Sequence, residues 1–82
     1  MVGLSDPRPL REQITSLITR RIADGTYAVG SKIPTARELA RECDVSERTI
    51  AEVIRGLRES GVLRGIPGRG VYVLRMPDDG DA

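Results

Sequence analysis

The stretch that decides the fold reads Ile33-Pro-Thr-Ala-Arg-Glu-Leu-Ala40, followed after a short gap by Val45-Ser-Glu-Arg-Thr-Ile50. Thr35 and Glu38 have the spacing of a capping box, in which each side chain satisfies a backbone amide at the start of a helix. Ser46 is the N-cap candidate of the next helix. This pattern predicts two helices joined by a tight turn, over about residues 36–43 and 46–59.

Two strand-like segments follow the second of these helices. Residues 62–66 and 71–74 are rich in β-branched and aromatic residues, and the loop Pro67-Gly-Arg-Gly70 between them has the composition of a hairpin turn. Gly61 is the candidate that ends the helix before the first strand. Two helices across a short turn, followed by a hairpin, are typical of a helix-turn-helix with a wing, a fold that places a helix in a groove of DNA.

One more helix is predicted before this motif. It is expected to start near Pro9, with Asp6 or a neighbour as its cap, and to end at Gly25 in a left-handed conformation. Apolar residues recur along it at spacings of three and four, which is the pattern of one buried helix face. These apolar residues are Leu10, Ile14, Leu17, Ile18 and Ile22.

The chain has the length of one small domain. Its 82 residues are 39% hydrophobic and 30% charged, which fits a folded globular protein. The predicted fold class is mainly α with a small β-hairpin of two or three strands, a three-helix winged helix-turn-helix over residues 9–75. Residues 1–8 are expected to be a lead-in, and residues 76–82 an acidic disordered tail or linker.

Several classes of protein are disfavoured by composition. The single cysteine, Cys43, cannot form an internal disulfide, and without histidine a zinc site is not expected. No apolar run approaches the roughly 18 residues that cross a bilayer, and the N-terminus lacks a signal-peptide pattern. We therefore expect a cytoplasmic protein with no membrane contact, metal or cofactor. Cys43 is expected to be buried, with a redox role as the alternative.

The charge is unevenly distributed along the chain. The formal net charge is +1, but residues 78–82 carry three acids and no base, so residues 1–77 hold 13 basic against 9 acidic residues. Twelve of the 13 basic residues are arginine, which matches phosphate and guanine edges bidentately. Codon usage in a GC-rich genome is the alternative explanation of this arginine content.

The span from Pro9 to Val73 resembles the winged helix-turn-helix domain of the GntR family of bacterial transcription regulators. The resemblance covers about four fifths of the chain, and it implies binding to a specific operator, usually as a dimer and usually as a repressor. The residues that carry it are Pro9-Leu10, Gln13-Ile14, Gly25, Gly30, Ile33-Pro34-Thr35, Arg37, Leu39-Ala40, Val45-Ser46, Thr49-Ile50, Leu57, Gly61-Val62-Leu63, Gly68-Arg69-Gly70 and Tyr72-Val73.

The resemblance also implies individual roles. An arginine at the position of Arg37 grips the phosphate backbone in the family, and residues matching Ser46 and Thr49 touch phosphate or base edges. The glycine-flanked wing tip enters the minor groove, which attracts arginine when narrow; the alternative for Arg37 and Arg69 is a merely solvated side chain. The full candidate DNA-binding set is Thr35, Arg37, Ser46, Glu47, Arg48, Thr49, Arg55, Arg64, Gly68, Arg69 and Gly70, with helix 46–59 in the major groove and residues 64–71 at the minor groove or backbone.

The chain departs from the family pattern at a few positions. Glu47 stands where arginine is common, with arginine one place later at Arg48. A glutamate there can accept a hydrogen bond from cytosine N4 but repels phosphate. Ala51 replaces another basic residue of some members, and Cys43-Asp44 replaces a leucine-glycine pair. The changes at Glu47 and Ala51 affect the expected operator sequence. The Cys43-Asp44 pair is not expected to alter the fold.

A larger departure concerns the second domain of the family. Members normally carry a C-terminal domain that binds a small effector and dimerises, and this chain contains no such effector domain. A minimal family member and a fragment cut at the linker both fit the sequence. Homodimers are therefore expected either in solution or only on DNA, where two copies would bind adjacent half-sites about one helical turn apart.

Functions other than operator binding have less support in the sequence. No histidine or P-loop is present, so an enzyme is not expected. The carboxylates lie at helical spacings suited to salt bridges with arginine, as at Glu38 with Arg41 and Glu59 with Arg55. A winged-helix protein-interaction module and a non-specific architectural DNA binder remain as the alternatives.

Overall fold

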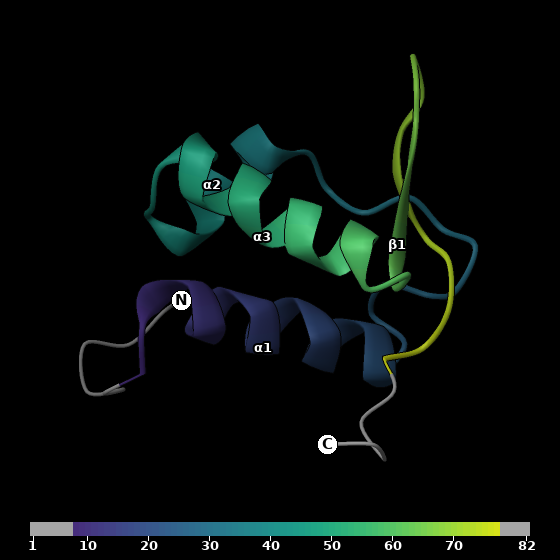
Figure 1. Ribbon diagram of the computed structural model, residues 1–82, viewed down its shortest axis with the longest axis horizontal. Helices are drawn as coiled ribbons and strands as arrows, with labels where there is room; N and C mark the ends of the chain where they lie inside the picture. Colours follow the sequence, from purple (N-terminus) through teal and green to yellow (C-terminus); the bar gives the residue numbers. More distant parts are fainter. Residues whose placement is uncertain (1–7, 78–82) are drawn as a thin grey trace.

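A computed structural model describes residues 8–77 of the chain, and within this range it contains three helices followed by one hairpin. The elements are α1 (Leu10–Ala23), α2 (Ala36–Cys43), α3 (Glu47–Glu59), β1 (Leu63–Ile66) and β2 (Gly70–Val73). In Figure 1, α1 runs beneath α3, α2 lies at one end, and the hairpin stands upright at the other end. The predicted three-helix winged helix-turn-helix is confirmed.

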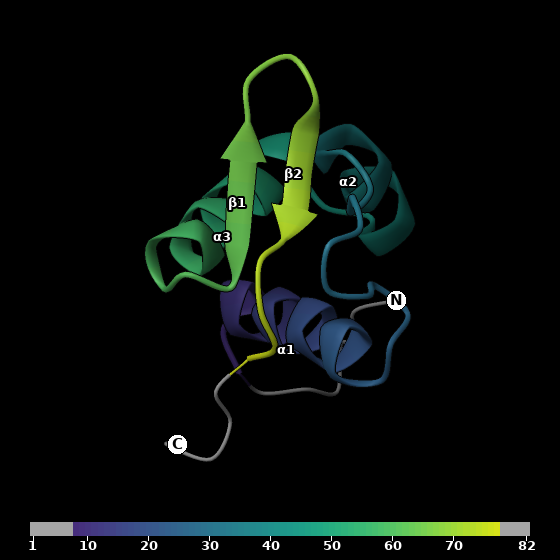
Figure 2. The same ribbon diagram turned by 90° about the vertical axis from the view of Figure 1, so that its right-hand side faces the viewer.

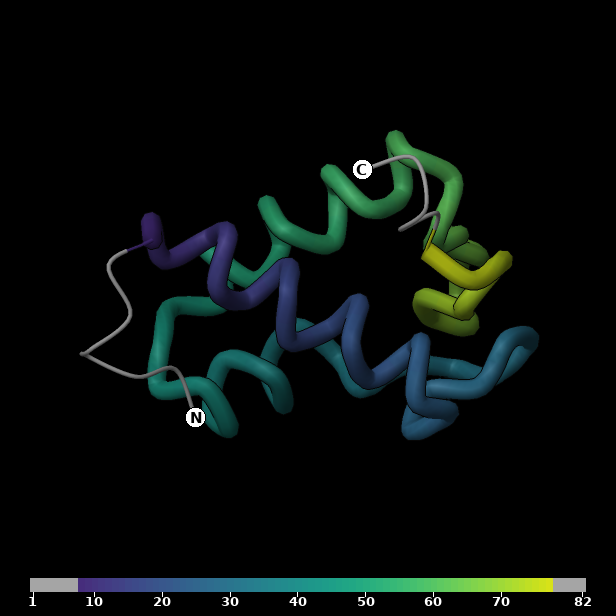
Figure 3. The backbone as a smooth tube through the Cα atoms, turned by 90° about the horizontal axis from the view of Figure 1, so that it is seen from below, coloured from purple at the N-terminus to yellow at the C-terminus, as the bar shows by residue number. Residues whose placement is uncertain are grey.

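The first helix buries a narrower face than its sequence pattern predicts. Ile14, Ile18 and Ile22 are fully or almost fully buried, whereas Leu17 is half-buried and Leu10 is 42% exposed. Leu10 is the first residue of the helix and lies beyond the end of the core, so its place in the buried face was predicted wrongly. Seen from below in Figure 3, α1 runs between α2 and α3. Its buried isoleucines belong to the same core cluster as buried residues of both helices.

The two ends of α1 differ in how they are capped. Pro9 occupies the N-cap position and makes no side-chain cap hydrogen bond. The predicted cap Asp6 lies outside the described residues, as do most of the predicted lead-in and tail. At the other end Gly25 adopts a φ of 89°, which confirms the left-handed termination predicted for it.

The turn between α2 and α3 forms as its sequence predicts. Thr35 Oγ1 accepts a hydrogen bond from the Glu38 amide at 3.1 Å, and Glu38 Oε1 accepts one from the Thr35 amide at 2.8 Å. Asp44 follows α2 with a φ of 60°, in the left-handed region that aspartate tolerates. Ser46 Oγ then accepts a hydrogen bond from the Thr49 amide at 3.1 Å and caps α3.

The hairpin is a two-stranded antiparallel sheet in which Leu63 pairs with Val73. Its loop closes through a hydrogen bond from the Arg69 amide to the Ile66 carbonyl, 2.9 Å long, with Gly68 at a φ of 77°. Figure 2 shows the two strands face on, with the chain before α2 running beside β2. There the Ile33 amide donates to the Val71 carbonyl at 2.9 Å, which adds a partial third edge to the wing.

The strand boundaries differ slightly from those predicted. Val62 lies outside β1 because its amide donates to the Leu57 carbonyl and so belongs to the turn that ends α3. Gly70 joins β2 because it pairs with Ile66, although the sequence suggested a loop residue. The first strand therefore begins one residue later than predicted, and the second both begins and ends one residue earlier, so Leu74 lies outside it.

The core is a single apolar cluster to which every element contributes. Within residues 8–77 every buried residue is hydrophobic, and the α3 contribution is the predicted face Ile50, Val53, Ile54 and Leu57. Each such side chain contributes about 1.5–3 kcal/mol when fully buried. Cys43 is buried as predicted, and this burial raises the pKa of its thiol, which disfavours the reactive thiolate. The core thus fixes α2, α3 and the hairpin relative to one another.

Candidate nucleic-acid interface

The first turn of α3 presents a polar surface held by its own cap. Glu47 and Arg48 are exposed, and Thr49 is half-buried. Thr49 Oγ1 lies 2.9 Å from Ser46 Oγ, so the two hydroxyl groups form a pair at the helix start. The capping bond leaves the Ser46 hydroxyl exposed, and its structural task is therefore compatible with contact to a phosphate at a helix N-terminus.

Arg48 belongs to an ion-pair group that joins α3 to α1. Its Nε lies 3.7 Å from Glu52 Oε2, and Arg11 Nε lies 3.1 Å from the other oxygen of the same carboxylate. The Arg48 side chain is nevertheless 87% exposed. Exposed pairs of this kind contribute only about 0–1 kcal/mol, so a DNA phosphate or guanine can replace Glu52 at little cost.

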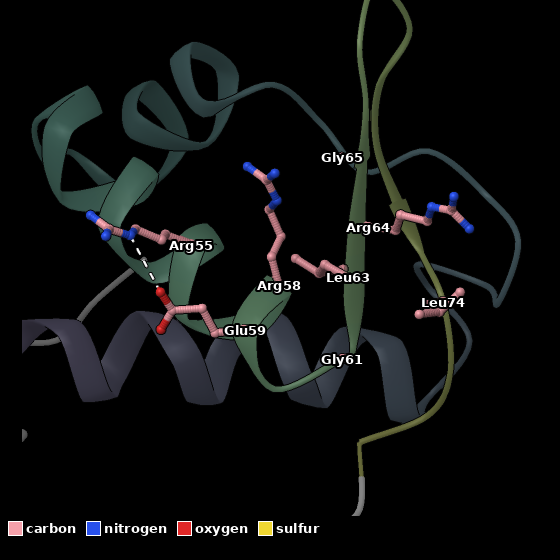
Figure 4. A pocket seen from close by; sticks show the side chains of 8 residues that line it. All are labelled: Arg55, Arg58, Glu59, Gly61, Leu63, Arg64, Gly65 and Leu74. Atoms are coloured by element: carbon pink, nitrogen blue, oxygen red, sulfur yellow. Dashed lines mark ion pairs between the residues drawn. The ribbon is translucent and has the colours of Figure 1, made fainter.

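Further along α3, Arg55 has a partner on its own helix. Its Nε lies 3.4 Å from Glu59 Oε2, which confirms the salt bridge predicted from their spacing and is drawn as a dashed line in Figure 4. Both side chains are mostly exposed. Arg55 therefore lies on the same outward surface as Arg48, two turns closer to the end of the helix.

Glu47 differs from the other carboxylates of α3. Glu52 and Glu59 each pair with arginine, whereas Glu47 forms no ion pair or side-chain hydrogen bond within residues 8–77. A negative charge in the first turn of a helix is favoured by the helix dipole, which explains its presence without DNA. The same carboxylate is also free to accept a hydrogen bond from a base.

Two candidates lie at the start of α2. Arg37 is exposed in the first turn and, in the described part of the chain, has no acidic partner. Thr35 is exposed as well, but its hydroxyl already accepts the capping hydrogen bond. The predicted pairing of Glu38 with Arg41 is not found. Instead, hydrogen bonds from Thr35 engage the Glu38 carboxylate and lower its pKa.

The wing tip is slender and cationic. Gly68 has no heavy atom within 4 Å of where a Cβ would stand, and Gly70 has a φ of 126°. Arg69 is exposed between them and forms no ion pair within residues 8–77. The tip therefore offers one arginine on a narrow backbone.

Arg64 borders the same open pocket as Arg55 and Arg58, but its side chain extends in a different direction. Figure 4 shows its side chain extending from β1 on the side away from α3, whereas Arg55 and Arg58 lie on the α3 side of the strand. The alternation of a strand explains this, because Leu63 faces the core and its neighbour must face the opposite way. Arg64 is exposed on the outer face of the wing.

Arg58 is a basic residue of this surface that sequence analysis did not select. It shares one face of α3 with Ala51, seven residues earlier, and with Glu47, eleven residues earlier, and both spacings were readable from the sequence. Its guanidinium lies against Gly65 of β1, a contact between separate elements that the sequence did not indicate. Arg58 and Ala51 line a groove of about 280 Å³ between α3 and the wing.

Another arginine holds the scaffold rather than the candidate surface. Arg21 forms an ion pair with Glu42 and donates a 2.7 Å hydrogen bond to the Tyr27 hydroxyl. Its guanidinium carbon also lies 5.7 Å from the centre of the Tyr27 ring. The Arg21 guanidinium lowers the pKa of Glu42, and the bonds to Glu42 and Tyr27 raise the pKa of Arg21. This cluster joins the end of α1 to α2.

Two other kinds of site are not found in the part of the chain that the structure describes. Across residues 8–77 no group of three or more histidine, cysteine, aspartate or glutamate side chains is arranged to hold a metal ion. Over the same residues no helix combines the length and hydrophobicity that a membrane span requires.

Comparison with known proteins identifies relatives of this chain. The chain is 38% identical over 66 residues to the mannosyl-D-glycerate transport/metabolism system repressor MngR of Escherichia coli (strain K12), over 80% of this chain and 28% of that protein. Several curated relatives match over only 14% to 30% of their own length.

Solved structures support the same relationship. A GntR family transcriptional regulator from Listeria monocytogenes has a TM-score of 0.81 at 32% identity, covering 87% of this chain and 62% of that one. The structure of AraR(DBD) in complex with operator ORX1 has a TM-score of 0.80 at 31% identity, covering 89% and 94%. The family model described as bacterial regulatory proteins, gntR family, matches residues 10–73. With most of its length matched, the chain belongs to the gntR family of bacterial regulatory proteins.

Proposed function

We propose that this chain binds a specific operator in duplex DNA and thereby regulates transcription. The observation that carries the proposal is that α2, α3 and the wing tip all lie above α1 in Figure 1, with exposed polar side chains at the starts of α2 and α3 and at the wing tip. Arg37 and Arg69 are exposed there without acidic partners in the described residues. Its likeness in fold to AraR(DBD), solved in complex with an operator, supports the same conclusion.

Each candidate residue then has a physical task. The start of α3 enters the major groove, where Glu47 and Arg48 face base edges and Ser46 and Thr49 contact phosphate or bases. Arg37 binds the phosphate backbone. Phosphate contacts supply most of the affinity and make it depend strongly on salt, whereas the base contacts supply specificity.

The wing completes the contact on the neighbouring groove. Gly68 and Gly70 keep the tip narrow, and Arg69 enters the minor groove, whose negative potential is strongest where it is narrow. Arg55, paired with Glu59, and Arg64, on the outer face of β1, serve as peripheral phosphate contacts. Thr35 mainly caps α2 and so fixes the position of Arg37.

Regulation is expected to follow from occupancy of the operator. MngR is named a repressor, and we infer repression for this chain as well. Two copies would bind adjacent half-sites about one helical turn apart, so that a homodimer forms at the latest on DNA. The protein acts in the cytoplasm, with no catalytic activity of its own, and its matched relatives are far longer than this chain.

The proposal is tested by titrating random-sequence duplex DNA with the chain, using fluorescence anisotropy at low and moderate salt, and then sequencing the bound fraction. Salt-sensitive binding that enriches one palindromic or repeated site is expected. Binding without enrichment would instead establish an architectural DNA binder. The absence of binding at low salt would leave the protein-interaction module as the function of this winged helix.

A further inference from the structure

The groove between α3 and the wing has no role in the function described above. It has a volume of about 280 Å³, and its walls come from the segment before α2 and the first residue of that helix, from α3, and from β2. Its apolar lining includes Pro34, Ala51, Ile54 and Val71, and Arg58 supplies a guanidinium at its α3 side. Lys32, from the segment before α2, also lines the groove, which therefore combines an apolar floor with two cations.

The Arg58 side chain is unusual in its surroundings. Among residues 8–77 it has no acidic partner and no side-chain hydrogen bond, although Glu59 lies next to it in sequence and pairs with Arg55 instead. A Cβ on Gly65 would stand 3.0 Å from Arg58 Cζ, 3.1 Å from Nη2 and 3.2 Å from Nε. The guanidinium thus occupies the space that any side chain at position 65 would take.

This placement keeps a positive charge between the two DNA-binding elements. Figure 4 shows Arg58 extending from α3 into the gap before β1, with its guanidinium near Gly65. An exposed arginine normally samples many rotamers, and immobilising a long side chain has an entropic cost. Contact with the flat backbone at Gly65 restricts these rotamers before any ligand arrives.

The geometry of duplex DNA indicates what fills the groove. A protein with α3 in the major groove and the wing tip in the adjacent minor groove must straddle the strand that separates the two grooves. The sugar–phosphate backbone of that strand then passes between α3 and the wing. Its sugars are partly apolar and its phosphates are anionic, which matches an apolar floor bordered by Lys32 and Arg58.

We propose that this groove seats the sugar–phosphate backbone of one DNA strand, with Arg58 as a phosphate contact positioned by Gly65. The inference rests on the proposed function, since it needs α3 and the wing on neighbouring grooves. It adds a contact outside the helix start and the wing tip. It also gives Gly65 a reason to lack a side chain, because its backbone φ does not lie in the left-handed region.

The first test replaces Arg58 with glutamine and measures affinity for random-sequence and selected duplexes between 50 and 200 mM salt. Loss of one phosphate contact should weaken binding to all sequences alike and reduce the salt slope by about one. The affinity ratio of wild type to R58Q should then shrink roughly 3.5-fold across that salt range. Arg20→Gln is the matched control, because it removes one exposed arginine from α1.

The second test moves the guanidinium without changing the charge. Gly65→Ala should displace Arg58 and weaken DNA binding in the same uniform way, while thermal unfolding shows an intact fold. The neighbouring atoms belong to the far end of a flexible side chain, so alanine can be accommodated in the strand. In the R58Q background, G65A should have no further effect on DNA affinity.

The outcomes separate this inference from the proposed function. If the wild type bound no DNA at low salt, the proposed function itself would fail. The wild type could bind DNA while R58Q lowers the affinity no more than R20Q does, or while G65A leaves the affinity unchanged. Either result would overturn only the proposal that the groove binds the DNA backbone. A loss confined to one DNA sequence would make Arg58 a base-reading residue and would also overturn it.

Discussion

Arg21 and Arg48 each pair with a glutamate, but their surroundings differ sharply. The Arg21 side chain is 23% exposed and is bonded to Glu42 and to the Tyr27 hydroxyl, while Arg48 is 87% exposed with one partner 3.7 Å away. In the first case the donors already have partners within the fold. In the second case most donors still face solvent. The difference shows how one residue type can stabilise one side of a small domain and bind ligand on the other.

The largest expected effect is on DNA affinity, from replacing the arginine at the start of α2. Arg37→Ala should lower affinity about 10-fold or more for every duplex, because a charge-assisted hydrogen bond to phosphate contributes about 1.5–3 kcal/mol. Its thermal unfolding should stay unchanged, since Arg37 has no acidic partner in the described residues. Anisotropy titrations measure the DNA affinity, and circular dichroism measures the thermal unfolding. Unchanged affinity would remove Arg37 from the interface.

Replacing Arg48, on the outward face of α3, should change the preference for DNA sequence as well as the affinity for DNA. Arg48→Ala should cost about 1–3 kcal/mol of discrimination at one base pair, as expected for a base contact. Competition between single-substituted versions of the selected operator measures this. The control is Arg55→Ala, which removes a similar exposed cation further along α3. A uniform loss across all versions would demote Arg48 to a phosphate contact.

Replacing Arg21, which joins α1 to α2, should lower the stability of the fold rather than the affinity for DNA. Arg21→Met keeps the apolar stem but removes the bonds to Glu42 and Tyr27, and should lower the free energy of unfolding by about 1–2 kcal/mol. Urea unfolding measures this loss. DNA affinity of the folded variant should equal that of the wild type. A loss of affinity at full folding would show that the scaffold and the interface are not separable.

The smallest expected effect is the acid dependence of the same cluster. Because Arg21 lowers the pKa of Glu42 below its ordinary 4.5, the folded state binds the proton less readily than the unfolded state. Stability from this pair is therefore fully present above pH 4.5 and is lost as pH falls through the lowered pKa. Glu42→Gln should make unfolding stability less dependent on acid in that window. An unchanged pH profile would mean that the pair contributes nothing in solution.

Local signals explain why so much of the fold could be predicted. The Thr35–Glu38 box, the Ser46 cap and the positive φ of Asp44 each depend on residues within four positions, and all three form. Leu10 shows the limit, because helical spacing predicts a face but cannot say where the core ends. The pairing of the segment before α2 with β2 was also not predicted. It joins Lys32 to Tyr72, which lie about 40 positions apart in the sequence.

The candidate site could be predicted as a set of positions but not as an arrangement. Spacing placed Arg48 on the outward face of α3, yet the shared use of Glu52 by Arg11 depends on how α1 crosses α3. Arg58 had the right spacing to join Glu47 and Ala51 on one face. Its contact with Gly65 appears only when the wing folds back against α3. The spacing of residues along one helix does not indicate its contacts with other elements.

The most direct test of specific DNA recognition is the ratio of affinities for the selected operator and for random duplex of the same length, measured at 150 mM salt. Recognition through base edges by α3 predicts a ratio of about a thousand or more. Salt affects the phosphate contacts of both duplexes alike, so the ratio isolates base reading. A ratio near one would contradict the account and leave a domain that binds DNA by charge alone.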